Sequence, residues 1–489
     1  MSKEETKHLN GDYSLKKIIM FAVAAIVTLI IWNLPLDAFG IDNLTIVQRR
    51  VIAMFTFAII MWVTECIPSW ATSMTIITMM VLTASDSSFV FLRGDSADFG
   101  TLMSSKSLMA TFADPIIMLF LGGFVLAIAA TKSGIDVTMT RKMIKPFGKK
   151  AEYVLLGFML ITGVFSMFIS NTATAAMMLT FLAPVFNALP PEGKGKIALT
   201  LSIPVSANIG GMATPIGTPP NAIALKYLND PAGLNLGIGF GEWMLVMLPF
   251  TLLMLFIAWK LLLYFFPFSA KEINLEINGN MKYNWRTTVV EITFALTVMM
   301  WLLDKVTGVN SNAVAMIPMG VFALTGVINA KDIQQINWSV IWMVAGGFAL
   351  GFALNKSGLA DNAIESIPFG EWSPVAILFI SAAICYFLSN FISHTATSSL
   401  MVPILVTVCM GMGDTLSSIG GTSTILVGVA ISCSCAMCLP ISTPPNAIAH
   451  STGLIEQNDM LKTGAIIGAI GLTFGYGMLF LIGKTGIFA

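Results

Sequence analysis

The sequence predicts an all-α membrane protein with many spans, built as two related halves. Hydrophobic residues make up 56% of its 489 residues and charged residues only 11%, whereas soluble domains carry about 25% charged residues. Apolar runs recur along the chain, several of them close to the roughly 20 residues that a helix needs to cross a bilayer. Short motifs from the first half also return in the second half in the same order.

The apolar runs predict helices rather than strands. Only helices and closed barrels satisfy their backbone in lipid, and these runs are continuous, whereas barrel strands alternate polar and apolar residues. The first run follows Lys16 and Lys17 without a clear small-residue cleavage site, so we expect a retained helix rather than a signal peptide. The main runs cover residues 17–32, 48–64, 115–130, 241–266, 288–303, 311–328 and 463–483.

The repeated motifs predict that the chain arose by duplication. FISNTAT at 168–174 returns as FISHTAT at 391–397, and TPPNAIA at 218–224 returns unchanged at 443–449. Three shorter motifs, GGF, KSG and PFG, recur in the same order, and all five repeats have offsets between 222 and 225 residues. Such self-similarity is typical of a repeated architecture. We therefore expect a first repeat with an N-terminal helix, a polar linker and a second repeat, at residues 1–265, 266–287 and 288–489.

Charge predicts that the two repeats have opposite orientations in the membrane. Residues 132–150 carry a net charge of +5, whereas the equivalent residues 356–374 carry −2. Cytoplasmic loops collect Lys and Arg, which places the first segment inside and the second outside. A solvated amphipathic face would also explain the basic segment, but not the reversed sign of its counterpart. Inverted repeats are typical of secondary transporters.

Each half contains two polar breaks in apolar sequence. Ser170, Asn171 and Thr172 interrupt a run whose flanks are too short for comfortable spans, so we expect a re-entrant hairpin with these residues at its tip. In the second break, two prolines end one helix, and Thr218 is placed to cap the next, with Pro219 at its first position. One such break is usually an ordinary cap or turn, but recurrence of both in both halves favours a binding site.

Helices that restart inside a membrane can bind anions. Their unpaired N–H groups and positive dipole ends point into the cavity, so an anion can bind without Arg or Lys. The freed carbonyls suit a small hard cation. Two such breaks related by pseudo-two-fold symmetry predict binding of a small dicarboxylate. The net charge of zero gives no reason to expect nucleic acid, and without an HExxH motif, paired catalytic carboxylates or a convincing metal cluster we expect no enzyme and no bound metal.

On these motifs the sequence resembles the divalent anion–sodium symporter family, the INDY-type di- and tricarboxylate carriers. The resemblance covers nearly the whole chain after residue 50. It implies an inverted repeat of about eleven transmembrane helices with two re-entrant hairpins. It further implies a homodimer, and an elevator in which scaffold and transport domains draw on both halves. The implied substrates are succinate, malate, fumarate and 2-oxoglutarate, without a cofactor. We expect the plasma membrane, with the N-terminus in the cytoplasm.

The resemblance also assigns site residues. The implied substrate-binding residues are Ser170, Asn171, Thr172, Thr218, Pro219, Ser393, His394, Thr395, Thr443 and Pro444. The implied first sodium site uses Ser166, Ser170, Asn171 and Gly217, and its counterpart uses Ser389, Ser393, His394 and Ser442.

His394 departs from the family, which has Asn at this position. An imidazole lacks the amide oxygen, and Ser442 in place of a glycine narrows the second loop, so we do not expect an intact second sodium site. A protonated His394 would act as a built-in counter-charge and hinder return of the empty carrier, and Lys226 is a second candidate for that role. We therefore expect sodium-independent exchange. The alternatives are a neutral His394, proton coupling, or sodium-coupled symport of di- and tricarboxylates or another divalent anion.

The predicted inversion can be tested by chemical labelling. Cysteines introduced singly at Lys145 and at Glu365 should react with a membrane-impermeant thiol reagent from opposite sides, because the two segments have opposite net charge. Reaction of both from the same side would contradict the inverted repeat.

Overall fold

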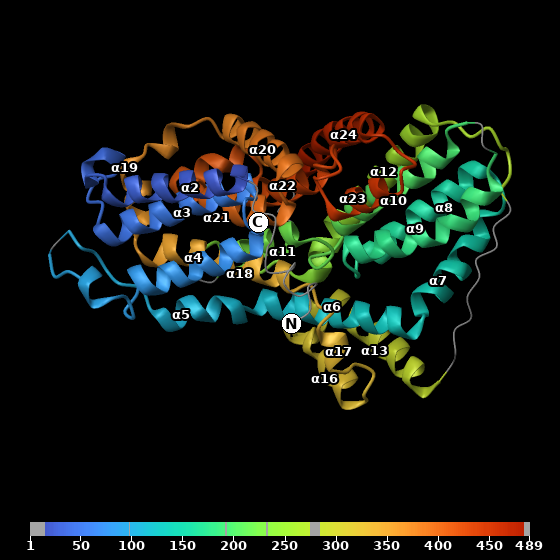
Figure 1. Cartoon of the computed structure of the whole chain (residues 1–489), viewed down its shortest axis with the longest axis horizontal. Helices are drawn as coiled ribbons and strands as arrows, with labels where there is room; N and C mark the ends of the chain where they lie inside the picture. The colour runs from blue at the N-terminus through green and yellow to red at the C-terminus, as the bar shows by residue number, and fades with distance from the viewer. Residues whose placement is uncertain (1–14, 97, 191–192, 231–232, 274–283, 484–489) are drawn as a thin grey trace. The chain divides into compact units, whose positions relative to one another are not determined.

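The computed structural model describes residues 15–96, 98–190, 193–230, 233–273 and 284–483. Over these residues the regular secondary structure is helical (Figure 1), and the extended pairing is limited to two isolated bridges, Ser85 with Met103 and Lys150 with Glu272. The predicted all-α class is confirmed.

Eight helical segments of the described chain are long and apolar enough to cross a membrane, which confirms a multi-pass membrane protein. They are Leu15–Asn33, Ile46–Thr64, Ser105–Ser133, Phe240–Phe265, Trp338–Lys356, Pro374–Phe391, His394–Ile419 and Gln457–Gly483. Four shorter apolar helices are Ser69–Ala84, Ala151–Ser166, Ser311–Leu324 and Thr422–Cys435. The implied number of spans and the two re-entrant hairpins remain predictions.

The chain divides into two compact units, and each contains residues from both halves of the sequence. The first comprises residues 1–113, 339–371 and 407–411, and the second comprises 114–338, 372–406 and 412–489. The predicted repeat boundaries, and the assignment of scaffold and transport domains, remain predictions. Residues 274–283 of the expected linker lie outside the described residues.

The described part of the first unit contains six α-helices, and a buried arginine bridges two of its segments. In it, α3 packs on α2 and α4. The buried Arg50 guanidinium donates to the carbonyls of Thr83 and Leu92, at 2.5 and 2.8 Å, which satisfies a charge that would otherwise be costly to bury. The helices are α2 (Leu15–Asn33), α3 (Ile46–Thr64), α4 (Ser69–Ala84), α5 (Ser105–Ala110), α18 (Trp338–Lys356) and α19 (Leu359–Ser366).

The second unit holds all the residues assigned to the sites. Its helices from the first half are α6 (Pro115–Ser133), α7 (Ile135–Ile144), α8 (Ala151–Ser166), α9 (Asn171–Ala188), α10 (Gly195–Gly211), α11 (Pro219–Leu228) and α12 (Phe240–Phe265). The next are α13 (Trp285–Leu302), α14 (Asp304–Thr307), α15 (Ser311–Val314), α16 (Met316–Leu324) and α17 (Ala330–Ile333). The last are α20 (Pro374–Phe391), most of α21 (His394–Met412), α22 (Thr422–Cys435), α23 (Pro444–Ser451) and α24 (Gln457–Gly483).

Two of the repeated motifs have matching backbone conformations in the two halves. The glycines of the two KSG motifs, Gly134 and Gly358, directly precede α7 and α19 with φ of 73° and 76°, a left-handed conformation that favours glycine. Thr218 and Thr443 precede α11 and α23 with φ, ψ of −147°, 141° and −143°, 149°. The matching backbone supports equivalent roles for the two copies.

Helices from opposite halves pack against each other around the breaks. The helices α8, α9 and α10 lie side by side in the second unit (Figure 1). The restarted helix α11 packs on α22, while its counterpart α23 packs on α10 and also on α9. Each restarted helix therefore rests on an interrupted helix of the other half.

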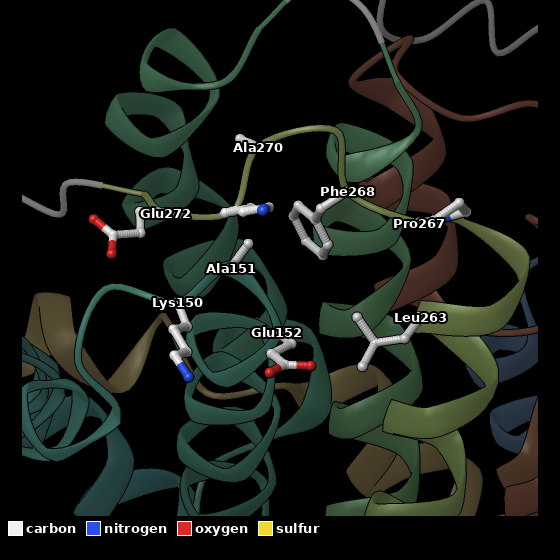
Figure 2. Close-up of a pocket in the computed structure, with 9 residues that line it drawn as sticks. Lys150, Ala151, Glu152, Leu263, Pro267, Phe268, Ala270 and Glu272 are labelled. Carbon is white, nitrogen blue, oxygen red and sulfur yellow. The ribbon is translucent and has the colours of Figure 1, made fainter.

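The start of the expected linker is joined to the start of α8. The amide of Ala151 donates to the carbonyl of Lys271 at 3.0 Å, and the amide of Ile273 donates to that of Lys149 at 2.7 Å. A cavity of about 540 Å³ lies beside this pairing, lined among others by Glu152, Leu263 and Phe268 (Figure 2). These bonds attach the connection between the halves to the basic end of residues 132–150.

Candidate functional site

The first polar motif lies where two short helices meet. Helix α8 ends at Ser166 and α9 begins at Asn171. The Ser170 hydroxyl accepts a hydrogen bond from the amide of Ala173 at 3.3 Å, as an N-cap residue does. The hydroxyl of Thr214, in the following loop, donates to the carbonyl of Met167 at 2.5 Å. This break and the loop between α10 and α11 are therefore held together.

Four oxygen atoms converge behind this motif. Asn171 Oδ1 lies 2.5 Å from Ser166 Oγ, 3.2 Å from the carbonyl oxygen of Ala207 and 3.1 Å from that of Gly217. Ser166 Oγ also donates to the Ala207 carbonyl at 2.7 Å. We call these four oxygens, from Ser166, Asn171, Ala207 and Gly217, the oxygen cluster. The only hydrogen among them is that of the Ser166 hydroxyl.

Crowded acceptors of this kind are stable in two ways. If the Asn171 amide turns by half a rotation, Nδ2 faces the cluster and donates to the two carbonyls and to Ser166 Oγ. If Oδ1 stays toward the cluster, a small cation among the oxygens would balance their partial negative charges, as carbonyls of interrupted helices do for sodium. The predicted residues Ser166, Asn171 and Gly217 belong to the cluster, whereas Ser170 serves as the helix cap.

Two asparagines satisfy the carbonyls left unpaired where the helices break. Asn221 Nδ2 donates to the carbonyls of Gly211, Met212 and Thr214, at 3.0, 3.2 and 2.8 Å. In the second half Asn446 Nδ2 donates to the carbonyls of Met437 and Leu439, at 2.9 and 3.0 Å. Both asparagines are buried. They fix the loops that present the N-termini of α11 and α23.

Asn208 joins the two halves at the second break, and sequence reasoning missed it. Its Nδ2 lies 3.3 Å from both Thr443 Oγ1 and Asn446 Oδ1. Asn208 is buried in the apolar helix α10. An isolated amide in an apolar run is the sequence signal that could have identified it. By the offset of the repeat, the residue equivalent to Asn208 in the second half is Cys433. Asn221, the equivalent of Asn446, correspondingly has an Oδ1 with no hydrogen-bond partner among the described residues. A side-chain amide therefore joins α10 to the loop before α23, and the described chain has no matching bond from α22 to the loop before α11.

The second polar motif contacts a different set of atoms. The buried His394 has its Nε2 2.7 Å from the carbonyl oxygen of Ala436. The Ser393 hydroxyl accepts from the amide of Ala396 at 3.1 Å. Ser442 Oγ donates to the carbonyl of Asn390 at 2.9 Å and accepts from the amide of Leu439 at 3.0 Å. These contacts join the break before α21 to the loop between α22 and α23.

The remaining predicted substrate-binding residues differ in exposure. Thr218, Thr395 and Thr443 are buried, whereas Thr172 and Pro219 are half-buried and Pro444 is exposed. The Thr443 hydroxyl accepts from the amide of Asn446 at 3.2 Å, while Thr218 makes no such cap bond. The N-terminus of α11 therefore lacks the side-chain cap that its counterpart has.

Lys226 is engaged in an ion pair rather than with the oxygen cluster. Its Nζ lies 2.7 Å from Asp114 Oδ2, and Asp114 Oδ1 accepts from the amide of Ile116 at the start of α6. The pair lies in a cavity of about 780 Å³ that also contains Asp304 and Lys305. In this conformation the positive charge of Lys226 is matched by Asp114.

Comparison with known proteins identifies the relatives of this chain. Residues 59–420 match the family CitMHS, described as citrate transporter. The sodium-dependent dicarboxylate transporter SdcS of Staphylococcus saprophyticus is 30% identical over 94% of this chain and 90% of that protein. The inorganic phosphate transporter PHO87 of Saccharomyces cerevisiae is 28% identical over 86% of this chain and 45% of that protein.

The fold is shared with a solved membrane-transporter structure. The YdaH transporter of Alcanivorax borkumensis superposes with a TM-score of 0.54 over 85% of this chain and 98% of that chain, at 10% sequence identity. At this identity the likeness shows the fold alone.

The role of the two loop asparagines predicts a loss of stability on substitution. Asn221→Ala and Asn446→Ala each leave buried carbonyls without donors, at about 1–3 kcal/mol for each unsatisfied group. Both variants should have a lower melting temperature than the native protein in detergent. Asn221→Asp, which keeps the shape but loses the donors, should be at least as unstable as the alanine variant, and a melting temperature unchanged in all three would contradict this role.

Proposed function

The chain belongs to the citrate transporter family CitMHS, with sodium-dependent dicarboxylate transporters among its relatives, and on this premise we propose that it couples uptake of small dicarboxylates to sodium. A tricarboxylate such as citrate is the closest alternative substrate. The observation that carries the proposal is the oxygen cluster of Ser166, Asn171, Ala207 and Gly217, which offers a cation three oxygens, and a fourth when the Asn171 amide turns its oxygen inward, beside the helix ends proposed to bind the anion.

Sodium coupling replaces exchange as the preferred mechanism. The sequence alone favoured sodium-independent exchange, but the relationship to SdcS supports sodium symport, the alternative considered there. Exchange remains a second candidate because His394 stands where the first half has Asn171. The two mechanisms differ in whether the empty carrier can return across the membrane without substrate.

Recognition of a dicarboxylate would use the ends of four helices. The N-termini of α9 and α11 offer N–H groups from one half, and those of α21 and α23 offer them from the other. Hydroxyl groups of Thr172 and Thr395 would add one donor at each end of the substrate. Inorganic phosphate, the substrate named for one relative, is a second divalent anion to be tested.

The Asn171 amide can link the two ligands. When Oδ1 faces a sodium ion in the oxygen cluster, Nδ2 is directed away from it and is free to donate to a carboxylate. Without the cation, Nδ2 is drawn to the carbonyls of Ala207 and Gly217 instead. Each ligand therefore favours the amide orientation that the other needs, which gives positive coupling between them.

The resemblance and the charge asymmetry extend the proposal to the whole protein. The transporter would lie in the plasma membrane as a homodimer, with its N-terminus in the cytoplasm. Two re-entrant hairpins and the restarted helices would move together as an elevator, alternately facing each side.

Uptake into proteoliposomes tests the proposed function. An inward sodium gradient should raise uptake of labelled succinate severalfold over a choline gradient, and unlabelled citrate or phosphate should compete if it shares the site. Vesicles preloaded with unlabelled succinate form the second arm. If preloading is essential and sodium is without effect, the protein is an exchanger and sodium symport is wrong.

The two threonines should contribute similarly to substrate affinity. Thr172→Ala and Thr395→Ala each remove a donor to a carboxylate, a bond worth about 1.5–3 kcal/mol, so the apparent affinity for succinate should fall roughly tenfold or more. Thr180→Ala is the matched control, because its hydroxyl is bonded within α9 to the carbonyl of Met177. A variant at Thr172 or Thr395 with the affinity of this control would remove that residue from the site.

A further inference from the structure

We propose that only the first of the two symmetry-related cation sites binds sodium, because His394 and Ala436 occupy the second with an N–H group and a methyl group. This inference rests on the proposed function and specifies its coupling. It follows from comparing the two halves position by position, using the offsets at which their motifs repeat.

The first difference is between Asn171 and His394. Asn171 can present an oxygen to the cluster. A ring nitrogen 2.7 Å from a carbonyl oxygen must carry a hydrogen, so His394 Nε2 donates to the carbonyl of Ala436. This hydrogen bond occupies a carbonyl oxygen of the second loop that a cation would otherwise bind. The N–H group also places its partial positive charge at that position. A buried neutral ring can make this bond without a cation.

The second difference is between Gly211 and Ala436. A Cβ atom placed on Gly211 would lie 2.7 Å from Asn171 Oδ1 and 3.0 Å from the carbonyl oxygen of Gly217. The space beside the first cluster therefore exists only because residue 211 has no side chain. In the second half the equivalent residue, Ala436, carries the methyl group that would fill this space.

The third difference concerns Gly217 and Ser442. At Gly217 a Cβ atom would come within 2.4 Å of the carbonyl oxygen of Gly211, so the two glycines of the first half depend on each other. Ser442 breaks this pairing in the second half. Its hydroxyl is bonded to the backbone of Asn390 and Leu439, and the second loop is held by these bonds instead.

Ser389 shows what the second site has lost. Its equivalent, Ser166, donates to the Ala207 carbonyl and contacts Asn171. Ser389 Oγ is buried and has no hydrogen-bond partner among the described residues. One hydroxyl does not make a cation site, since hard cations are held by several oxygen ligands at once. Ser389 matches its counterpart Ser166, whereas His394 and Ser442 differ from Asn171 and Gly217.

The number of sodium ions sets how steeply substrate binding responds to sodium. When sodium is well below saturation, one coupled site gives a slope of about one in a plot of log affinity against log sodium concentration, and two sites give about two. We expect the native protein to show a slope near one.

The experiment measures succinate binding to the purified protein by calorimetry across a range of sodium concentrations, with choline keeping the ionic strength constant. The triple variant His394→Asn, Ala436→Gly and Ser442→Gly rebuilds the first-half sequence in the second half. Its slope should rise toward about two. The converse variant, Asn171→His, should lose the sodium dependence of binding, because it places an N–H group in the only working site.

The outcomes separate this inference from the proposed function. A native slope near two would overturn the inference and leave sodium coupling intact. A native slope of zero, with no sodium effect on uptake, would overturn both. A triple variant that binds succinate with an unchanged slope contradicts the role given to His394 and Ala436. If that variant fails to fold, the native slope and the Asn171→His variant decide the question.

Discussion

The polar site depends on how the carbonyl groups left unpaired at the ends of α10 and α22 are satisfied inside the protein. In an apolar surrounding each unpaired group is costly, yet the helices must break if their N–H groups are to face a ligand. Asn221 and Asn446 resolve this conflict, because one side-chain amide takes two or three carbonyls at once. The prolines that follow each threonine then start the next helix at a fixed place. The hydrogen bonds that satisfy the carbonyls at each helix break thus also hold the N-termini of α11 and α23 in place.

The two halves have similar backbone conformations at the second break of each half, but different side-chain contacts around it. Thr218 and Thr443 have nearly the same conformation, and each restarted helix packs on a helix from the other half. The side chains at the centre do not follow this symmetry. Asn208 reaches the second loop, while Cys433 occupies the equivalent position, and His394 replaces the amide that contributes to the oxygen cluster. Equivalent positions in the two halves therefore share a backbone conformation while their side chains differ in chemistry.

The sequence was sufficient for the fold class and for the location of the breaks, because apolar length, proline pairs and exact repeats are local or internal signals. It placed Asn171 and His394 at equivalent positions, but it did not identify the carbonyl that each one meets. The bond from Asn208 to Thr443 joins residues far apart in the chain, so no local sequence pattern predicts it. Lys226 was a candidate counter-charge from the sequence, yet it forms an ion pair with Asp114, more than a hundred residues earlier. The preference for exchange came from reasoning about His394 and Ser442 alone, and the relationship to SdcS favoured sodium coupling.

The bond between His394 and Ala436 also has an electrical consequence. A dianion that travels with one sodium ion moves one net negative charge, and the inside-negative voltage of a cell opposes its entry by about 2.3 kcal/mol per 100 mV. With two sodium ions the same step would be electroneutral. With a single sodium site, as proposed above, the carrier would work against the voltage during uptake, and the same voltage would favour export of the anion.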